Sequence, residues 1–195
     1  MTRTARENDR FCARALALFF VLLLPFGTGT AASKAAAREF QKRVIDYLSL
    51  RNRVEGQLPQ LKKDASAQEI ALHRQLLGER IRAARSGARR GDIFFPAIRR
   101  QIATAIRSEL RGPGSETARV TVMEGNPKVE GQAKVEVEVN RTYPHAAPVS
   151  SVPPTLLLKL PELPKDLEYR FVGHDLILHD AKASLIVDYI KDVVP

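Results

Sequence analysis

The chain of 195 residues has no tryptophan and only one cysteine, Cys12. Cys12 lies before an apolar segment, and we expect both to be removed together. The remaining chain then contains no thiol. It can form no disulfide, no thiolate metal site and no cysteine nucleophile. A small secreted scaffold held together by disulfides is therefore excluded, and packing alone must stabilise the fold. The chain also lacks a glycine-rich phosphate loop and the Gly-x-Ser-x-Gly turn of many hydrolases, which removes two large enzyme classes.

The N-terminal segment 1–32 has the order of a secretory signal peptide. A basic stretch precedes ten consecutive apolar residues, Ala15 to Leu24, and small residues follow up to Ala32. We therefore predict cleavage near Ala32 and a periplasmic or secreted bacterial protein. Ten apolar residues are too few to cross a bilayer, which takes about 20. The alternative is an uncleaved N-terminal anchor, because weakly apolar residues continue to Ala37.

Charge divides the remaining 163 residues into two parts. The net charge of the whole chain is +9, but residues 34–111 carry +10 and residues 112–195 carry −3. We therefore expect a basic helical region, 33–112, followed by a β-rich region, 113–195. The length suits one domain, and the two regions are expected to pack together in it.

The basic region predicts three helices. Apolar residues recur every three or four positions in 34–56, and Ser66 to Glu69 forms a capping box that opens a second helix, 67–90. Gly91 suits the C-terminal cap of that helix, and Pro96 suits the first turn of a third helix, 96–111. The apolar faces expected for the three helices are Phe40, Val44, Tyr47, Leu48 and Val54, then Ile70, Leu77, Ile81 and Ala84, then Ile98, Ile102, Ile106 and Leu110.

The second region changes to the period of a β-strand. Charged and apolar residues alternate strictly in 134–139, and 119–123 is expected to pair with it as a strand. The tail, from 167 to 190, predicts a three-stranded meander with turns at 173–175 and 180–183. Helices followed by strands, without β-α alternation, indicate an α+β fold with an antiparallel sheet.

Four arginines of the second predicted helix are candidate binding residues: Arg74, Arg82, Arg85 and Arg89. At 100° per residue they fall within an arc of about 80°, and arginines arranged in this way can bind the phosphates of lipid headgroups, lipopolysaccharide or nucleic acid. The alternative is a solvated helix face. The expected address outside the cytoplasm and the lack of an aromatic stacking platform disfavour nucleic acid. Tyr143, in a loop rich in proline, is the fifth candidate.

Two His-Asp pairs, His174-Asp175 and His179-Asp180, invite a metal or acid-base interpretation. The spacing speaks against a metal site, because positions five apart on one strand face opposite sides. Aspartate is also a common turn residue. These four residues therefore remain weak candidates beside the simpler role of forming turns.

A proline-bounded apolar strip, 153–164, is a candidate docking surface for a protein partner. It contains Leu156, Leu157, Leu158 and Leu160 between prolines that limit the entropy lost on binding. The alternative is that these leucines fill the core.

The tail resembles a group of exported bacterial proteins of unknown function. The similar stretches are LEYRFVGHDLILHD (167–180), LIVD (185–188), NRTYP (140–144), LPELP (160–164) and GDIF (91–94). The resemblance implies a protein of the bacterial envelope and carries no activity or site with it.

These observations favour a non-catalytic envelope protein that binds an anionic component or another envelope protein, and they indicate no cofactor. The alternative function is a metal-dependent or acid-base hydrolase that uses the two His-Asp pairs. Contact with the membrane is expected only through the N-terminal segment, if that segment is uncleaved. The sequence indicates no oligomeric state.

Overall fold

The computed structural model describes residues 31–126, 135–144 and 147–195. Its helices come first and a three-stranded antiparallel sheet comes last, which confirms the predicted α+β fold. The apolar run of the predicted signal peptide lies outside the described residues. Among the helices in the described ranges, none combines the length and the apolar character needed to span a membrane.

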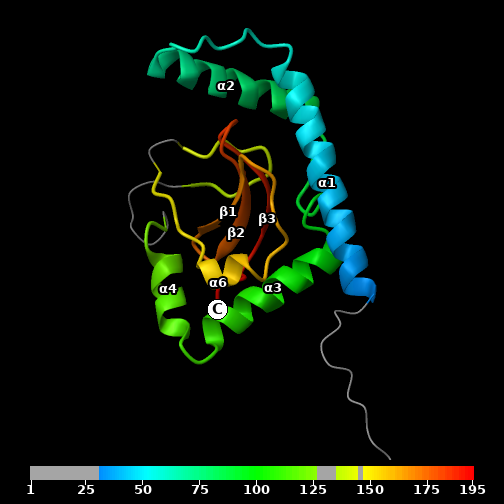
Figure 1. Cartoon of the computed structure of the whole chain (residues 1–195), viewed down its shortest axis with the longest axis vertical. Coiled ribbons are helices and arrows are strands. Elements are labelled where there is room, and N and C mark those ends of the chain that lie inside the picture. The colour runs from blue at the N-terminus through cyan, green and yellow to red at the C-terminus, as the bar shows by residue number, and fades with distance from the viewer. Residues whose placement is uncertain (1–30, 127–134, 145–146) are drawn as a thin grey trace, which may run out of the picture.

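Helix α1 (Ala31–Glu55) runs along one side of the molecule (Figure 1). It begins three residues before the predicted start and ends before Gly56, as expected. Its buried face contains Phe40, Val44, Tyr47 and Val54, and Leu48 packs against the same core. The period of three and four residues therefore predicted the inward face of this helix correctly.

Helix α2 (Ala67–Ala84) begins with the predicted capping box, in which Ser66 and Glu69 satisfy each other's backbone N–H groups. Its predicted end at Arg90 is wrong, and Gly91 is not its cap. The helix stops at Ala84 because the backbone of Arg85 leaves helical geometry, and the Arg85 carbonyl accepts a bond from Asn140 Nδ2 at 3.0 Å.

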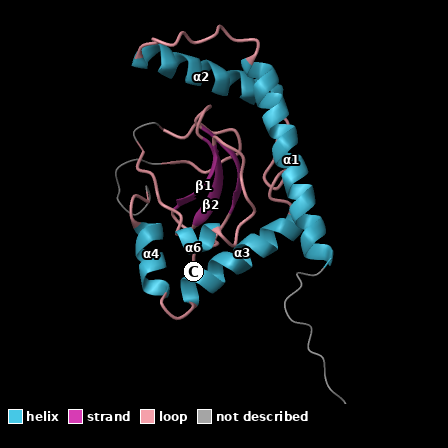
Figure 2. Ribbon diagram, viewed as in Figure 1, coloured by secondary structure: helices cyan, strands magenta, loops and turns pink. Residues whose placement is uncertain are grey.

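The apolar face of α2 is also narrower than predicted. Leu77 and Ile81 are buried as expected, whereas Ile70 is 42% exposed and Ala84 is exposed. Figure 2 shows why: α2 lies across the upper end of the molecule, so only part of its length faces the sheet.

Helix α3 (Pro96–Arg111) has the predicted bounds, and all four residues of its predicted face are buried. Helix α4 (Ser115–Met123) replaces the predicted strand 119–123. Ala118 and Val122, four residues apart, pack into the core, and Arg119 Nε donates to the Leu110 carbonyl at 2.7 Å. Packing on α3 thus overrides the strand preference of the β-branched residues in this segment.

The strand predicted at 134–139 is also wrong for its described part, 135–139, which contains no strand residue. Val135 is buried and Glu136 exposed, so the alternation of faces is real. The backbone hydrogen bonds to the segment around Ile186 are made instead by the residues that follow, Asn140 and Arg141. Asn140 N–H donates to the Ile186 carbonyl, and Ile186 N–H donates to the Arg141 carbonyl. This short bridge pairs with the edge of the sheet formed by residues 185–190, where the predicted strand was expected.

The sheet contains β1 (Leu167–Val172), β2 (Asp175–Asp180) and β3 (Leu185–Ile190) in the order β1-β2-β3. This is the predicted meander. The β1–β2 register is regular and pairs Tyr169 with Leu178, whereas a bulge at Leu178/His179 interrupts the pairing of β2 with β3. A short helix, α6 (Pro154–Leu157), forms part of the proline-bounded strip.

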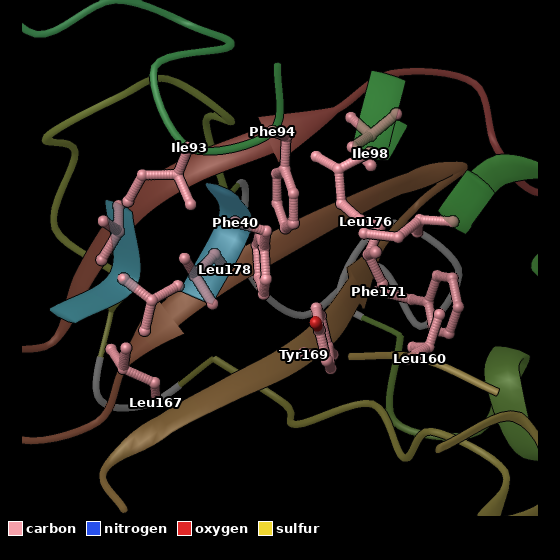
Figure 3. Close-up of a cluster of buried hydrophobic side chains, with 14 of the residues drawn as sticks. Phe40, Ile93, Phe94, Ile98, Leu160, Leu167, Tyr169, Phe171, Leu176 and Leu178 are labelled. Carbon is pink, nitrogen blue, oxygen red and sulfur yellow. The ribbon is translucent and has the colours of Figure 1, made fainter. Parts of the chain in front are cut away.

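One face of the sheet and the helices share a single core. Figure 3 shows Phe40 of α1 and Tyr169 of β1 in this core together with Phe94. The rings of Phe40 and Phe94 stack with centroids 5.9 Å apart, and Phe94 stacks on Tyr169 at 6.4 Å. The opposite face of the sheet is covered by a smaller apolar cluster that contains Val135, Tyr143 and Ile177. Strand β2 is therefore buried on both faces, whereas Glu168 and Arg170 of β1 and Tyr189 of β3 are only partly buried.

Candidate anion-binding cleft

A cleft of about 330 Å³ lies between α2 and the loops at one end of the sheet. Its lining residues come from α2, from the segment after Asn140 and from the β2–β3 turn: Ala71, Arg74, Gln75, Gly78, Glu79, Arg82, Thr142, Tyr143, Ala183 and Ser184. The structure thus brings together three of the five predicted binding residues, Arg74, Arg82 and Tyr143. The volume lies within the range of small-molecule sites.

Gly78 sets the close approach of α2 to the β2–β3 turn. A Cβ atom at this position would lie 2.9 Å from the Ala183 carbonyl oxygen, closer than real Cβ atoms come. Ser184, which follows in the turn, has a φ of 49° and therefore adopts a left-handed conformation. Any residue larger than glycine at position 78 would push α2 off the turn and widen the cleft.

Arg74 and Arg82 flank Gly78 on the same side of α2, because residues four apart lie one above the other. Their Cα atoms are about 12 Å apart along the helix axis at 1.5 Å per residue. Arg82 Nη1 donates to Thr142 Oγ1 at 2.6 Å, which fixes one guanidinium at the cleft. Within the described residues, the Arg74 guanidinium makes no hydrogen bond or ion pair.

The cleft carries a net positive charge. Its two arginines outnumber its one carboxylate, Glu79, and that carboxylate already accepts a bond from Gln75 Nε2 at 3.0 Å. The hydroxyl groups of Thr142 and Ser184 add polar groups to the lining. The arrangement of two guanidinium groups and hydroxyls suits an oxyanion such as a phosphate or carboxylate.

Tyr143 joins the cleft to the covered face of the sheet. Its N–H donates to the Ser184 carbonyl at 2.8 Å and its hydroxyl donates to the Pro148 carbonyl at 2.6 Å. Its ring lies 4.9 Å from the ring of His179. Burial raises the pKa of the Tyr143 hydroxyl, so this group stays protonated at neutral pH. Tyr143 therefore contributes shape and rigidity to the cleft rather than charge.

Arg85 and Arg89 do not line the cleft. Both Arg85 Nη atoms donate to the Val187 carbonyl at 3.2 Å, and the guanidinium lies 5.1 Å from the centroid of the Tyr47 ring. Arg89 follows the end of α2 and holds Asp92 through its backbone N–H. The four arginines do not form one helical face, because α2 ends before two of them.

The two His-Asp pairs lie at opposite ends of β2, about 17 Å apart at 3.4 Å per residue. His174 Nδ1 lies 3.0 Å from the Val194 carbonyl, and Asp175 Oδ1 accepts from Asp192 N–H at 3.1 Å. At the other end, Asp180 is buried and accepts bonds from Tyr47 Oη and from the backbone of the β2–β3 turn. The described ranges hold no group of three side chains of the kind that binds a metal ion.

Sequence reasoning missed the residues that shape the cleft from the other side, Gly78 and the β2–β3 turn. A signal for Gly78 exists, since it lies four residues from both Arg74 and Arg82 and a glycine inside a helix often marks a close contact. Sequence reasoning also missed Asp188, a buried carboxylate that accepts backbone N–H bonds from Gly91, Ile93 and Phe94. This carboxylate holds the segment between α2 and α3 against β3.

No family model, curated protein or solved structure matches the chain.

Proposed function

We propose that this protein is an exported, non-catalytic component of the bacterial envelope that binds an anionic group in the Arg74–Arg82 cleft. The observation that carries the proposal is Arg74. Its guanidinium lines the cleft and has no partner among the described residues, while Thr142 holds Arg82 beside it. A guanidinium makes its strongest bonds with phosphate or carboxylate oxygens.

Only the sequence of residues 1–32, with its basic stretch and apolar run, supports the proposed location in the envelope. In the envelope, the commonest surface-bound oxyanions are the phosphates of lipid headgroups and of lipopolysaccharide. A phosphate group in the cleft would face two guanidinium groups and the hydroxyls of Thr142 and Ser184.

A binding role is favoured over catalysis by the hydroxyl groups of the cleft. Nucleophilic catalysis by serine or threonine needs a base within hydrogen-bond distance. In the described part of the chain, Thr142 Oγ1 bonds to Arg82, and Ser184 Oγ bonds to no histidine or carboxylate. These groups can contact a ligand, and no base among the described residues is bonded to them.

Binding of three probes by the purified protein tests the proposal: inorganic phosphate, lipopolysaccharide, and phosphatidylcholine vesicles with and without phosphatidylglycerol. Arg74→Gln should weaken the binding of lipopolysaccharide or of anionic vesicles about tenfold, the equivalent of one charge-assisted hydrogen bond. Binding should also weaken with added salt, because the Debye length shortens. Binding of inorganic phosphate alone would identify a free anion rather than a headgroup as the ligand.

Arg111→Gln is the matched control, since it removes one positive charge from an exposed residue at the end of α3 that does not line the cleft. Equal weakening by Arg74→Gln and Arg111→Gln would mean that total charge drives the binding. That result, or binding that neither substitution changes, would contradict a specific role for the cleft.

A further inference from the structure

Within the part of the chain that the structure describes, the outer edge of β1 presents backbone groups without a partner. Phe171 pairs with Leu176 in register, yet its N–H donates to Ser150 Oγ at 2.7 Å and its carbonyl accepts from the same hydroxyl at 2.8 Å. The backbone of Phe171 thus faces away from β2. Because this direction alternates along a strand, Tyr169 N–H and C=O face the same outer side. No residue in the described ranges bonds to either group.

The free edge is short and bounded at both ends. Ser150 covers Phe171 at one end, and at the other end Leu167 N–H donates to the Pro164 carbonyl at 3.2 Å. Between these points, the Tyr169 N–H and C=O and the Leu167 C=O have no hydrogen-bond partner among the described residues. Figure 3 shows the Tyr169 and Leu167 side chains in the core, and the two residues are only 7% and 5% exposed, so the groove reaches a small part of each.

A groove of about 530 Å³ lies beside this edge. Its walls come from residues 149–152 and 161–163, and its apolar lining includes Val152, Leu157 and Leu163. Leu157 is 47% exposed although it belongs to the short helix α6. The groove therefore offers an apolar surface next to an unpaired strand edge.

We propose that the β1 edge and this groove bind an extended segment of a partner protein, which adds a short fourth strand to the sheet. One residue of the segment would exchange two hydrogen bonds with Tyr169, as a residue of a β-strand does. The side chain that lies on the same face as the Tyr169 side chain would be apolar and would enter the groove. Its two neighbours would be polar, because they lie beside the paired charges of Glu168 and Arg170.

The backbone N–H and C=O of Tyr169 favour a peptide over other ligands. Tyr169 presents one donor and one acceptor, and a neighbouring peptide backbone offers the complementary pair in one residue. A phosphate or carboxylate would satisfy the N–H and leave the carbonyl without a donor. A second copy of this chain would bring its own flanking segments, 149–152 and 161–163, against those of the first. The inference is independent of the Arg74–Arg82 cleft, which α2 and the β2–β3 turn form.

Amide hydrogen exchange in the free protein provides the first test. The Tyr169 amide should exchange at least about tenfold faster than the Phe171 amide, since only the second is bonded. Slow exchange of Tyr169 in dilute protein would overturn the proposal, because the edge would then already be paired. Protection of Tyr169 that grows with protein concentration would identify a second copy as the occupant and would overturn it as well.

An array of hexapeptides with alternating polar and apolar residues provides the second test. The best peptide should bind with a Kd below about 1 mM and should slow the exchange of the Tyr169 amide. N-methylation of its central backbone nitrogens should weaken binding at least about tenfold, because the side chains remain and the donors are lost. Equal binding of the N-methylated peptide, or no peptide that binds below this limit, would overturn the proposal.

Leu163→Lys places a charge in the groove and should weaken the peptide at least about tenfold. Leu158→Lys is the matched control, because Leu158 is 88% exposed and does not line the groove. Equal effects of the two substitutions would count against the groove. The N-methylated peptide keeps the proposal testable if Leu163→Lys does not fold.

Discussion

Mild acid should destabilise the folded protein through His179. This imidazole is only 6% exposed on β2, and its Nδ1 accepts a hydrogen bond from Arg170 Nε at 3.2 Å. Burial lowers the pKa of His179 to about 4, and the positive charges of Arg170 and Arg74 act in the same direction. Glu168, 3.9 Å from Nδ1, is the one facing carboxylate that opposes this shift among the described residues. His179 is therefore neutral in the folded protein at neutral pH.

The size of the effect follows from the two pKa values. An unfolded histidine has a pKa of about 6.5. Between about pH 6.5 and pH 4, His179 is therefore protonated in the unfolded chain and neutral in the folded protein. Stability is complete above this window and falls as the pH falls through it. From pH 7 to pH 5 the free energy of unfolding should fall by about 2 kcal/mol, and the loss should reach about 3 kcal/mol below pH 4.

The measurement is urea unfolding at pH 7 and pH 5 for the natural protein and for His179→Gln. Glutamine offers Arg170 an acceptor and takes up no proton in this range, so the variant should lack about 2 kcal/mol of the pH dependence. The comparison is needed because burial raises the pKa of Asp188, despite four backbone N–H groups, and this group stabilises the folded state as the pH falls. The same pH dependence in both proteins would refute the argument.

Three further predictions concern packing and processing. Gly78→Ala should cost about 1–3 kcal/mol of unfolding free energy by denaturant titration, because its Cβ would meet the Ala183 carbonyl. Gly87→Ala, with open space around it, should change stability by less than about 1 kcal/mol. Asp188→Asn should cost about 3 kcal/mol in the same assay, since two backbone N–H groups lose their acceptor and face an amide donor. N-terminal sequencing of the exported protein should begin near Ser33, and an intact N-terminus would favour the anchor instead.

Much of the fold could be predicted because local signals and tertiary packing agree. The repeat of Ile98, Ile102 and Ile106 defined α3, and the capping box of Ser66 and Glu69 defined the start of α2. The turns of the meander carry their own signals as well, since Gly173 has a φ of 63°. In each case the residues that form the element also orient it toward the core.

The two wrong strands show where local signals fail. Residues 119–123 alternate in a way that suits a strand, but Ala118 and Val122 are also four apart and match the helical surface of α3. In 135–139 the alternation predicts correctly which side chains are buried. It does not predict the backbone bonds, because β3 pairs instead with Asn140 and Arg141.

The candidate residues of the cleft could be predicted, but their grouping could not. Arg74 and Arg82 lie on one helix and can be paired from their spacing. Their proximity to Tyr143 depends on the contact between Gly78 and Ala183, more than 100 positions apart in the chain. No local pattern reports such a contact, and the same holds for the outward-facing backbone of Tyr169.

Several arginines of the basic region bond within the protein, so fewer positive charges can bind a ligand than the net charge of this region indicates. Arg51 is buried beside Asp180 and Asp166, and Arg85 bonds to the backbone of β3. Arg43 pairs with Glu39 and lies over the Phe95 ring. These arginines hold α1 and α2 to the rest of the fold, so replacing them would reduce stability as well as charge.

A comparison of Arg74 with the exposed Arg111 of α3 avoids this confusion, because neither guanidinium bonds to the described protein. Loss of binding at Arg74 alone would therefore report on the cleft rather than on the net charge of +9.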